Sequence, residues 1–382
     1  MPDRPSRPSP DAAAAAPGIA ARLAYKPSLA AVLERLRGLY SRRAPERICA
    51  SFEAPSRALA GFAAQHTAAF CDYPDPAGRA AFWDAFLQER AALEDDSIPL
   101  AYLSEFDQGL YGALLGGDIR FLAHPENAWI SSMVPPLLDN WYEFDRLEFR
   151  EDAPWFSRYR RQLEIFVEKA RGRFAVSHFI LINGLNFVFE LVGATRTYIS
   201  LVDCPATVRR AVELAFQVNL RVQETFFAAV PLLAGGTASN MAQWIPGRII
   251  SESVDPFHMT SRRYFEEWGR EPVQRMFDRF DGGVLHLHGN GRHLLEAVQT
   301  IRGLQALFLG DDRGYAPACE LLPEFRRRAP GLPFVVQIGR AAFEEGLARR
   351  TLPGGIFYKV LGETAVDDAN RLMERVHAYS WG

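Results

Sequence analysis

The last hundred residues alternate short apolar runs with amphipathic segments. The apolar runs read "VLHLH", "LQALFLG", "FVVQI" and "GIFYKV", and they begin at residues 284, 304, 334 and 355. The segments that follow them have the apolar spacing of helices: "GRHLLEAVQTI", "ACELLPEFRRRA", "RAAFEEGLARR" and "TAVDDANRLMERVHAY". Parallel strands require such crossover connections, so four consecutive strand–helix units predict a parallel sheet covered by helices. A doubly wound sheet and a (β/α)8 barrel both fit.

The earlier part of the chain favours the barrel. Four further strands are predicted at "RICASF", "IPLAYL", "FAVSHFILI" and "VPLLAGG". The helical segments between them include "GRAAFWDAFLQERAALE", "WFSRYRRQLEIFVEKA" and "PATVRRAVELAFQVNLRVQETFFAAV". About eight strands in roughly 350 residues match one α/β domain, a single (β/α)8 TIM barrel over residues 23–382. Residues 1–22 are rich in proline and alanine and are predicted to be a disordered tail.

Composition narrows the classes of function. The 382 residues carry a net charge of -3 without a long basic run, so neither a nucleic-acid surface nor an anionic-membrane surface is indicated. Four cysteines lie far apart without a C-x-x-C pair, which predicts a reducing, cytoplasmic environment. No apolar run approaches the roughly 20 residues that span a bilayer. No strand is followed by G-x-G-x-x-G, so a dinucleotide site has no support.

The stretch "VLHLHGNG" holds the strongest candidate chemistry. His286 and His288 are two residues apart on a predicted strand, so their side chains share one face of the sheet. Gly289 then turns the chain toward a helix. Because the carboxyl ends of barrel strands carry the catalytic residues, both imidazoles are candidates for an active site.

Three stretches together resemble the uroporphyrinogen decarboxylase superfamily. They are "QWIPGRIISESVDPFHMTSRRYFEEW" (243–268), "VLHLHGNGRHLLEAVQTIRGLQALFLGDD" (284–312) and "AYLSEFDQGLYGALLGGDIRF" (101–121). The resemblance runs from about residue 45 to the C-terminus. It implies a (β/α)8 barrel with a substrate cleft at its mouth, and in several members a homodimer.

The resemblance implies two chemistries. Decarboxylases of the superfamily act without a cofactor, and Asp107 and His286 fall at their aspartate and histidine. Zinc methyltransferases move a methyl group between a corrinoid and a thiol, and Glu252 falls where some of them have an acidic residue near the metal. The chain departs from both. It lacks the arginine-rich decarboxylase signature, and His288 and Gln337 stand where the methyltransferases have cysteines.

Glu252, His286 and His288 form a candidate metal-binding set. Two histidines and one carboxylate bind zinc, manganese or ferrous iron and leave positions open for water or substrate. Such a metal would acidify a bound water or polarise a carbonyl group. The alternative is a polar pocket lined by neutral histidines.

Further polar residues lie near the predicted strand ends. Glu105 and Asp107 alternate in "SEFDQG" and would face the same way in an extended segment, where paired carboxylates serve as acid and base. Arg248 could hold a substrate carboxylate or form a structural salt bridge. Asp255 could orient Arg248 or a histidine, and Asn290 could donate to a substrate oxygen or stabilise its turn.

The sequence therefore predicts an enzyme at a barrel mouth, with a small-molecule substrate. The leading prediction is a lyase that decarboxylates a carboxylated, tetrapyrrole-like substrate without a cofactor, in which His286 contacts the substrate, Asp107 stabilises positive charge and Arg248 holds a carboxylate. The second is a metal-dependent methyltransferase that works with a corrinoid partner protein. The third is a barrel without catalytic activity that binds a tetrapyrrole or corrinoid.

Overall fold

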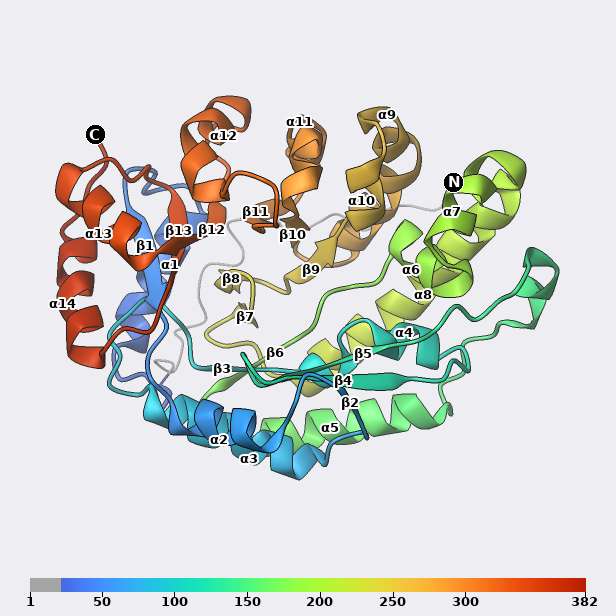
Figure 1. The fold of residues 1–382 in the computed structure, drawn as a ribbon, viewed down its shortest axis with the longest axis horizontal. Helices are drawn as coiled ribbons and strands as arrows, with labels where there is room; N and C mark the ends of the chain where they lie inside the picture. Colours follow the sequence, from blue (N-terminus) through green and yellow to red (C-terminus); the bar gives the residue numbers. More distant parts are fainter. Residues whose placement is uncertain (1–21) are drawn as a thin grey trace, which may run out of the picture.

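A computed structural model describes residues 22–382 (Figure 1). Its strands are β1 (Ile48–Phe52), β2 (Phe70–Cys71), β3 (Leu100–Tyr102), β4 (Arg120–His124), β5 (Trp129–Met133), β6 (Ala175–Ser177), β7 (Gly236–Ser239), β8 (Gln243–Pro246), β9 (Ile250–Ser253), β10 (Gly283–Leu287), β11 (Leu304–Leu309), β12 (Phe334–Gly339) and β13 (Ile356–Leu361). Its helices are α1 (Leu29–Tyr40), α2 (Arg57–Gln65), α3 (Pro76–Glu89), α4 (Gly109–Ala113), α5 (Pro154–Ala170), α6 (Gly184–Val192), α7 (Ala194–Asp203), α8 (Pro205–Ala229), α9 (Arg262–Tyr264), α10 (Arg270–Arg279), α11 (Leu295–Val298), α12 (Leu322–Arg328), α13 (Arg340–Arg349) and α14 (Val366–His377).

Parallel strands form the centre of the molecule. One sheet has the order β1-β13-β12-β11-β10-β9, with every neighbouring pair parallel. A second parallel pair joins β3 to β6. After β6, Leu181 forms a parallel bridge with Glu252 of β9, and before β3 the amide of Asp96 donates to the carbonyl of Ala50 in β1, at 2.9 Å. The β3–β6 pair therefore contacts both edges of the six-stranded sheet.

The two faces of these strands have different partners. The outward side chains of β10, Leu285 and Leu287, belong to the large core shared with the helices, because alternate residues of a strand point to opposite faces. Val284 points inward and belongs to a second core with Met241 and Trp244 of the β7–β8 hairpin. Figure 1 shows the helices outside the strands, and it shows the β7–β8 hairpin on the inner side of the strands. The hairpin thus fills the inner side near the strand beginnings.

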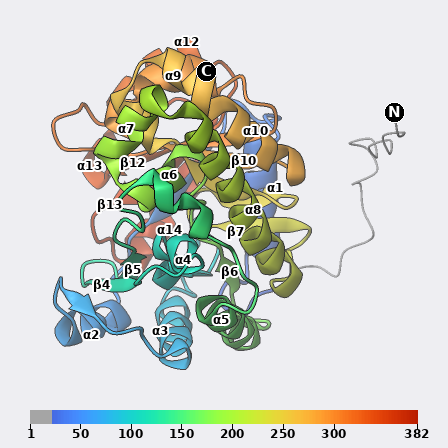
Figure 2. The ribbon, with the colours of Figure 1, turned by 90° about the vertical axis from the view of Figure 1, so that its right-hand side faces the viewer.

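A small antiparallel sheet of order β2-β4-β5 lies beside α2 (Figure 2). Its apolar side chains form a third cluster with those of α2, including Phe62, Phe121 and Ile130. The sheet brings Trp129, at the start of β5, against Tyr102 of β3, with ring centroids 4.9 Å apart. The small sheet therefore adds an aromatic side chain next to the end of β3.

Most predicted strands agree with the structure, and one does not. The run "VPLLAGG" (230–236) was predicted to be a strand, but it connects α8 to β7 and turns at Gly235, where φ is +76°. The parallel strand of this region is β9, twenty residues later. The predicted tail of residues 1–22 lies outside the described residues, except for Arg22. Within residues 22–382, no helix combines the length and apolar character needed to cross a bilayer.

Candidate functional site

His286 and His288 lie together at the end of β10, as predicted. Their ring centroids are 4.4 Å apart, and the ring of His286 stacks on Phe308 of β11 at 5.0 Å. Burial, with smaller effects from nearby charges, lowers the pKa of His286 to about 3, so its imidazole is neutral at physiological pH. A Cβ atom at Gly310 would lie 2.7 Å from Nε2 of His286, so only glycine leaves room for this ring.

Asp312 orients the imidazole of His288. The Nδ1 atom of His288 lies 2.9 Å from Oδ1 of Asp312, and the backbone amide of Gly289 donates to the other oxygen of the same carboxylate. Burial alone would raise the pKa of Asp312, but these hydrogen bonds and the nearby histidines hold it below its ordinary value. A carboxylate at Nδ1 fixes the tautomer in which Nε2 is free to accept a proton.

Asp255 and His258 complete a polar cluster on the other side of His288. The Oδ1 atom of Asp255 lies 3.9 Å from Nε2 of His288 and 3.7 Å from Nδ1 of His258, while Ser253 donates to its Oδ2 atom at 3.1 Å. Burial raises the pKa of Asp255 and lowers that of His258 to about 3. Of the two predicted partners of Asp255, the structure therefore places a histidine next to it and not Arg248.

His258 was not among the predicted site residues. Its ring centroid nevertheless lies 5.6 Å from that of His288. A Cβ atom at Gly291 would lie 2.2 Å from Cδ2 of His258, so the second glycine of "HGNG" makes space for this ring. The available signal was this repeated glycine together with the three-residue spacing between Asp255 and His258.

Glu252 does not join the histidines, which corrects the predicted metal-binding set. In the parallel register, Glu252 pairs with Leu285 and Ser253 pairs with His286, so the Glu252 side chain points to the opposite face of the sheet from the imidazoles. It accepts a hydrogen bond from Asn183 at 3.1 Å, and burial raises its pKa to about 8. Across residues 22–382, no group of three or more His, Cys, Asp or Glu side chains has the geometry to hold a metal ion.

The zinc-thiolate chemistry of the resemblance also lacks its sulfur ligands. Cys49 is buried in the inner core with the β7–β8 hairpin, and Cys319 lies outside the sheet beside Tyr358. Cys71 and Cys204 belong to β2 and to the start of α8. Neither Glu252 nor a thiolate of these four cysteines accompanies His286 and His288, so these residues do not fit the zinc site of the methyltransferases.

Arg248 lies at the wrong end of its strand to hold a substrate at the rim. It precedes β9, whereas the histidines follow the ends of the parallel strands. Its backbone amide donates to Asp281 at 2.8 Å, and its guanidinium group lies 3.8 Å from the same carboxylate. The salt-bridge alternative is therefore the one that the structure contains, and the predicted carboxylate clamp was wrong.

Glu105 and Asp107 do not form a carboxylate pair. The segment Ser104–Phe106 is a 3-10 turn rather than an extended strand, and the two side chains have separate partners. Glu105 is buried against Arg79 and accepts a hydrogen bond from Gln162 at 2.8 Å. Asp107 accepts a hydrogen bond from the hydroxyl group of Tyr102 at 2.7 Å, and burial raises its pKa to about 6. No hydrogen bond or ion pair within the described chain links Asp107 to His286.

Asn290 lies in the 3-10 turn that follows β10. Its carbonyl oxygen lies 3.1 Å from Nδ1 of His293, whose Nε2 atom is 2.9 Å from the carbonyl of Thr260. These contacts stabilise the turn, and His293 is exposed. A role of Asn290 toward a substrate stays a prediction.

A cavity of about 310 Å³ is lined by residues other than those of the histidine cluster. It is bounded by β1, β12 and β13, by the segment 97–102 and by the turn of the β7–β8 hairpin. Lys359 of β13 lines it, and its Nζ atom lies 4.5 Å from the ring centroid of Phe308, the same ring on which His286 stacks. Phe308 therefore contacts both His286 of the histidine cluster and Lys359 of the cavity wall.

The comparisons with known proteins concern the fold. No protein-family model and no curated protein sequence matches this chain. In three dimensions the chain is similar to a solved methyltransferase from Methanosarcina mazei, with a TM-score of 0.58 and 11% sequence identity. The similarity covers 91% of this chain and 98% of that chain. At this identity the likeness shows that nearly the whole chain has the α/β fold of that protein, and it gives no support to the predicted decarboxylase.

Proposed function

We propose that this chain is a (β/α)8 barrel enzyme that transfers a methyl group. The eight barrel strands would be β1, β3, β6 and β9 to β13. The hydrogen bond from Asp96, before β3, to β1 and the parallel bridge from Leu181, after β6, to β9 support closure. The whole-chain likeness to a methyltransferase supports the class of reaction, and the rim position of the histidines supports the location of the active site.

The observation that carries the proposal is the hydrogen bond between Asp312 and His288. An acceptor thiol or amine must lose a proton to become a good nucleophile. Because Asp312 engages Nδ1, the Nε2 atom of His288 takes that proton. The acceptor's lone pair then forms a bond to the methyl carbon. The bond between the methyl carbon and its donor breaks, and both electrons stay with the donor.

The other residues of the cluster hold this base in place. Asp255, 3.9 Å from Nε2 of His288, stabilises the imidazolium that forms. His286 remains neutral and provides a flat wall beside the acceptor. The methyl donor in this proposal is a methyl-corrinoid presented by a partner protein, which follows the family resemblance. The acceptor is activated by the histidine rather than by a metal.

The test uses free methylcobalamin as donor and a panel of small thiols and amines as acceptors. Loss of the methyl–cobalt absorbance and mass spectrometry of the methylated acceptor report the transfer. We expect His288→Asn to lower the rate by about 10² to 10⁴, the typical contribution of general acid–base catalysis. Asp312→Asn retains a hydrogen-bonding group but loses the charge, and it should shift the pH profile of the remaining activity.

His293→Asn is the matched control. His293 lies on the same turn but contacts only backbone carbonyls among the described residues, so its replacement should leave the rate within about twofold of the wild-type rate. Equal rates for the wild-type protein and His288→Asn would contradict the proposed base. Failure of every acceptor class would contradict methyl transfer itself.

A further inference from the structure

Lys359 is an ammonium group with spare hydrogen-bonding capacity inside the cavity. Its three N–H donors have a single protein acceptor among residues 22–382, the carbonyl of Asn240, at 2.8 Å. Lys359 lies on β13, and its neighbours in the parallel register are Ser51 on β1 and Gln337 on β12. All three side chains therefore point to the same, inner face of the sheet. These neighbours line the same cavity and add a hydroxyl and an amide beside the ammonium group.

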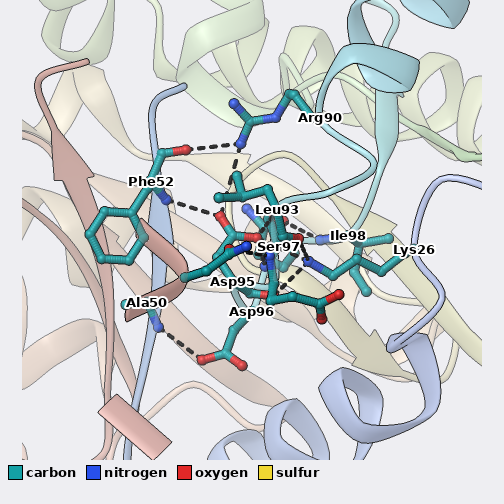
Figure 3. A network of polar contacts seen from close by, with 12 residues as sticks. Lys26, Ala50, Phe52, Arg90, Leu93, Asp95, Asp96, Ser97 and Ile98 are labelled. Atoms are coloured by element: carbon teal, nitrogen blue, oxygen red, sulfur yellow. Dashed lines mark hydrogen bonds and ion pairs between the residues drawn. The ribbon is translucent and has the colours of Figure 1, made fainter. Parts of the chain in front are cut away.

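The other cations that line the cavity are already neutralised. Lys26 lies 3.1 Å from Oδ1 of Asp95 and donates to two carbonyls, and Arg90 donates to the carbonyl of Phe52 and lies 3.9 Å from Asp95 (Figure 3). Within the part of the chain that the structure describes, Lys359 has no carboxylate within 4 Å. Among the described residues of the cavity wall, Lys359 is therefore the cation that is not paired with a carboxylate.

A single negative charge matches this wall better than two. Glu53 also lines the cavity, with its Oε2 atom held by the backbone amide of Gly362 at 2.8 Å. Its carboxylate would repel a doubly charged group placed near Lys359. A monoanionic group that accepts from Lys359 is repelled by Glu53 less than a dianionic group is.

The remaining wall is aromatic. The rings of Tyr102 and Trp129 are in contact, with their centroids 4.9 Å apart. Trp83 and Phe86 line the same cavity, and their ring centroids are 5.8 Å apart. Nε1 of Trp83 and Oδ1 of Asn240 are buried without a hydrogen-bond partner among residues 22–382. Buried polar atoms normally have such partners, so both point to a ligand with polar edges.

We propose that this cavity binds a planar aromatic monocarboxylate, with its carboxylate on Lys359, Ser51 and Gln337 and its ring against Trp129 and Tyr102. That this ligand also carries the thiol or amine that accepts the methyl group rests on the proposed function. Phe308 contacts both Lys359 and His286, so the end of the cavity at Lys359 is the end next to the histidine cluster. The binding itself does not depend on turnover.

The experiment measures binding of 2-naphthoate and of its neutral analogue 2-naphthamide by isothermal titration calorimetry. We expect the acid to bind about 10- to 100-fold more tightly than the amide, the range of a charge-assisted hydrogen bond. Lys359→Met should weaken naphthoate binding by the same factor and leave naphthamide binding unchanged. Burial lowers the pKa of Lys359 to about 8, so the preference for the acid should fade as the pH rises through that value.

Lys169→Met is the matched control. Lys169 lies on α5 with its ammonium group 3.0 Å from Asp84, away from the cavity, so its replacement should leave both affinities unchanged. Equal affinities for the acid and the amide, no binding of either, or naphthoate binding that Lys359→Met does not weaken would overturn the inference. A His288→Asn variant that binds naphthoate normally but transfers methyl groups at the wild-type rate would contradict the proposed function and leave the binding inference intact.

Discussion

The β3–β6 pair meets the six-stranded sheet at two junctions, and each junction contains a buried carboxylate. Beside β1, Asp95 and Asp96 accept from the backbone amides of Phe52 and Ala50, at 3.0 and 3.1 Å. Beside β9, the backbone contact is the bridge of Leu181, and Glu252 accepts a hydrogen bond from the amide of Asn183. The first junction uses side-chain carboxylates where a longer strand would use carbonyls.

The two junctions differ in the partners of their carboxylates. Burial alone would raise the pKa of Asp95, but the charges of Lys26 and Arg90 and several hydrogen bonds hold it below its ordinary value. Glu252 is equally buried and has only the Asn183 amide as a hydrogen-bond partner within residues 22–382, so its pKa rises to about 8. The same burial therefore gives an ionised acid at one junction and a neutral acid at the other, because only one has cations.

The largest expected effect is a pH dependence of stability that belongs to Glu252. A raised pKa in the folded state contributes stability that is complete below about pH 4.5 and is lost as the pH rises through about 8. Since one pKa unit corresponds to about 1.4 kcal/mol, the loss is on the order of 5 kcal/mol. Urea unfolding should show Glu252→Gln close to the wild type at pH 5 and more stable than it at pH 9.

Glu213→Gln controls for the general effect of pH. Glu213 is a surface glutamate paired with Arg275 at 2.7 Å, and hydrogen bonding to that arginine lowers its pKa. Its difference from the wild type should therefore not grow between pH 5 and pH 9. A difference for Glu252→Gln that is equally flat would show that Glu252 is ionised throughout.

The next effect concerns the charged junction. Asp95→Ala removes the acceptor of the Phe52 amide and leaves the ammonium group of Lys26 buried without its carboxylate. Breaking a buried ion pair in this way costs about 3–5 kcal/mol, measurable as a fall in the free energy of unfolding in urea. Asp145→Ala, which breaks an exposed pair with Arg210, should cost less than about 1 kcal/mol. Equal costs would mean that the junction at β1 does not depend on its charges.

The smallest effect separates the two partners at the neutral junction. Asn183→Ala removes the hydrogen bond to Glu252 and a second one to the carbonyl of Pro272 at 3.3 Å. We expect a cost of about 1–3 kcal/mol in urea unfolding at pH 7. Combined with Glu252→Leu, which removes the acceptor, the two changes should not add, because each removes one side of the same contact. Strict additivity would indicate that the Asn183–Glu252 contact contributes nothing.

The regular half of the fold was predictable from local pattern. The strands β10 to β13 follow one another with a helix after each, and their apolar runs fell within a residue or two of the observed bounds. The β3–β6 pair is harder to read because each strand has three residues and side chains complete its junctions. "VPLLAGG" misled because an apolar run does not distinguish a strand from a buried connection.

The site was predictable where it depends on spacing within one strand. The two-residue spacing placed His286 and His288 on one face. Glu252 could not be placed, because its face depends on the register between β9 and β10, and a shift of one residue reverses it. The sequence also gave no sign that Arg248 precedes its strand rather than ending it, or that Asp312 would reach back across the turn to His288.

The turn of the β7–β8 hairpin has a consequence for how this protein could diversify. Asn240 belongs to that turn, holds Lys359 through its carbonyl and forms part of the cavity wall. One wall of the cavity is therefore formed by a loop that belongs to none of the parallel strands. Lengthening or shortening this loop by one or two residues would change the depth of the cavity without changing the parallel strands. A change of ligand in related proteins would then require only insertions or deletions in this turn.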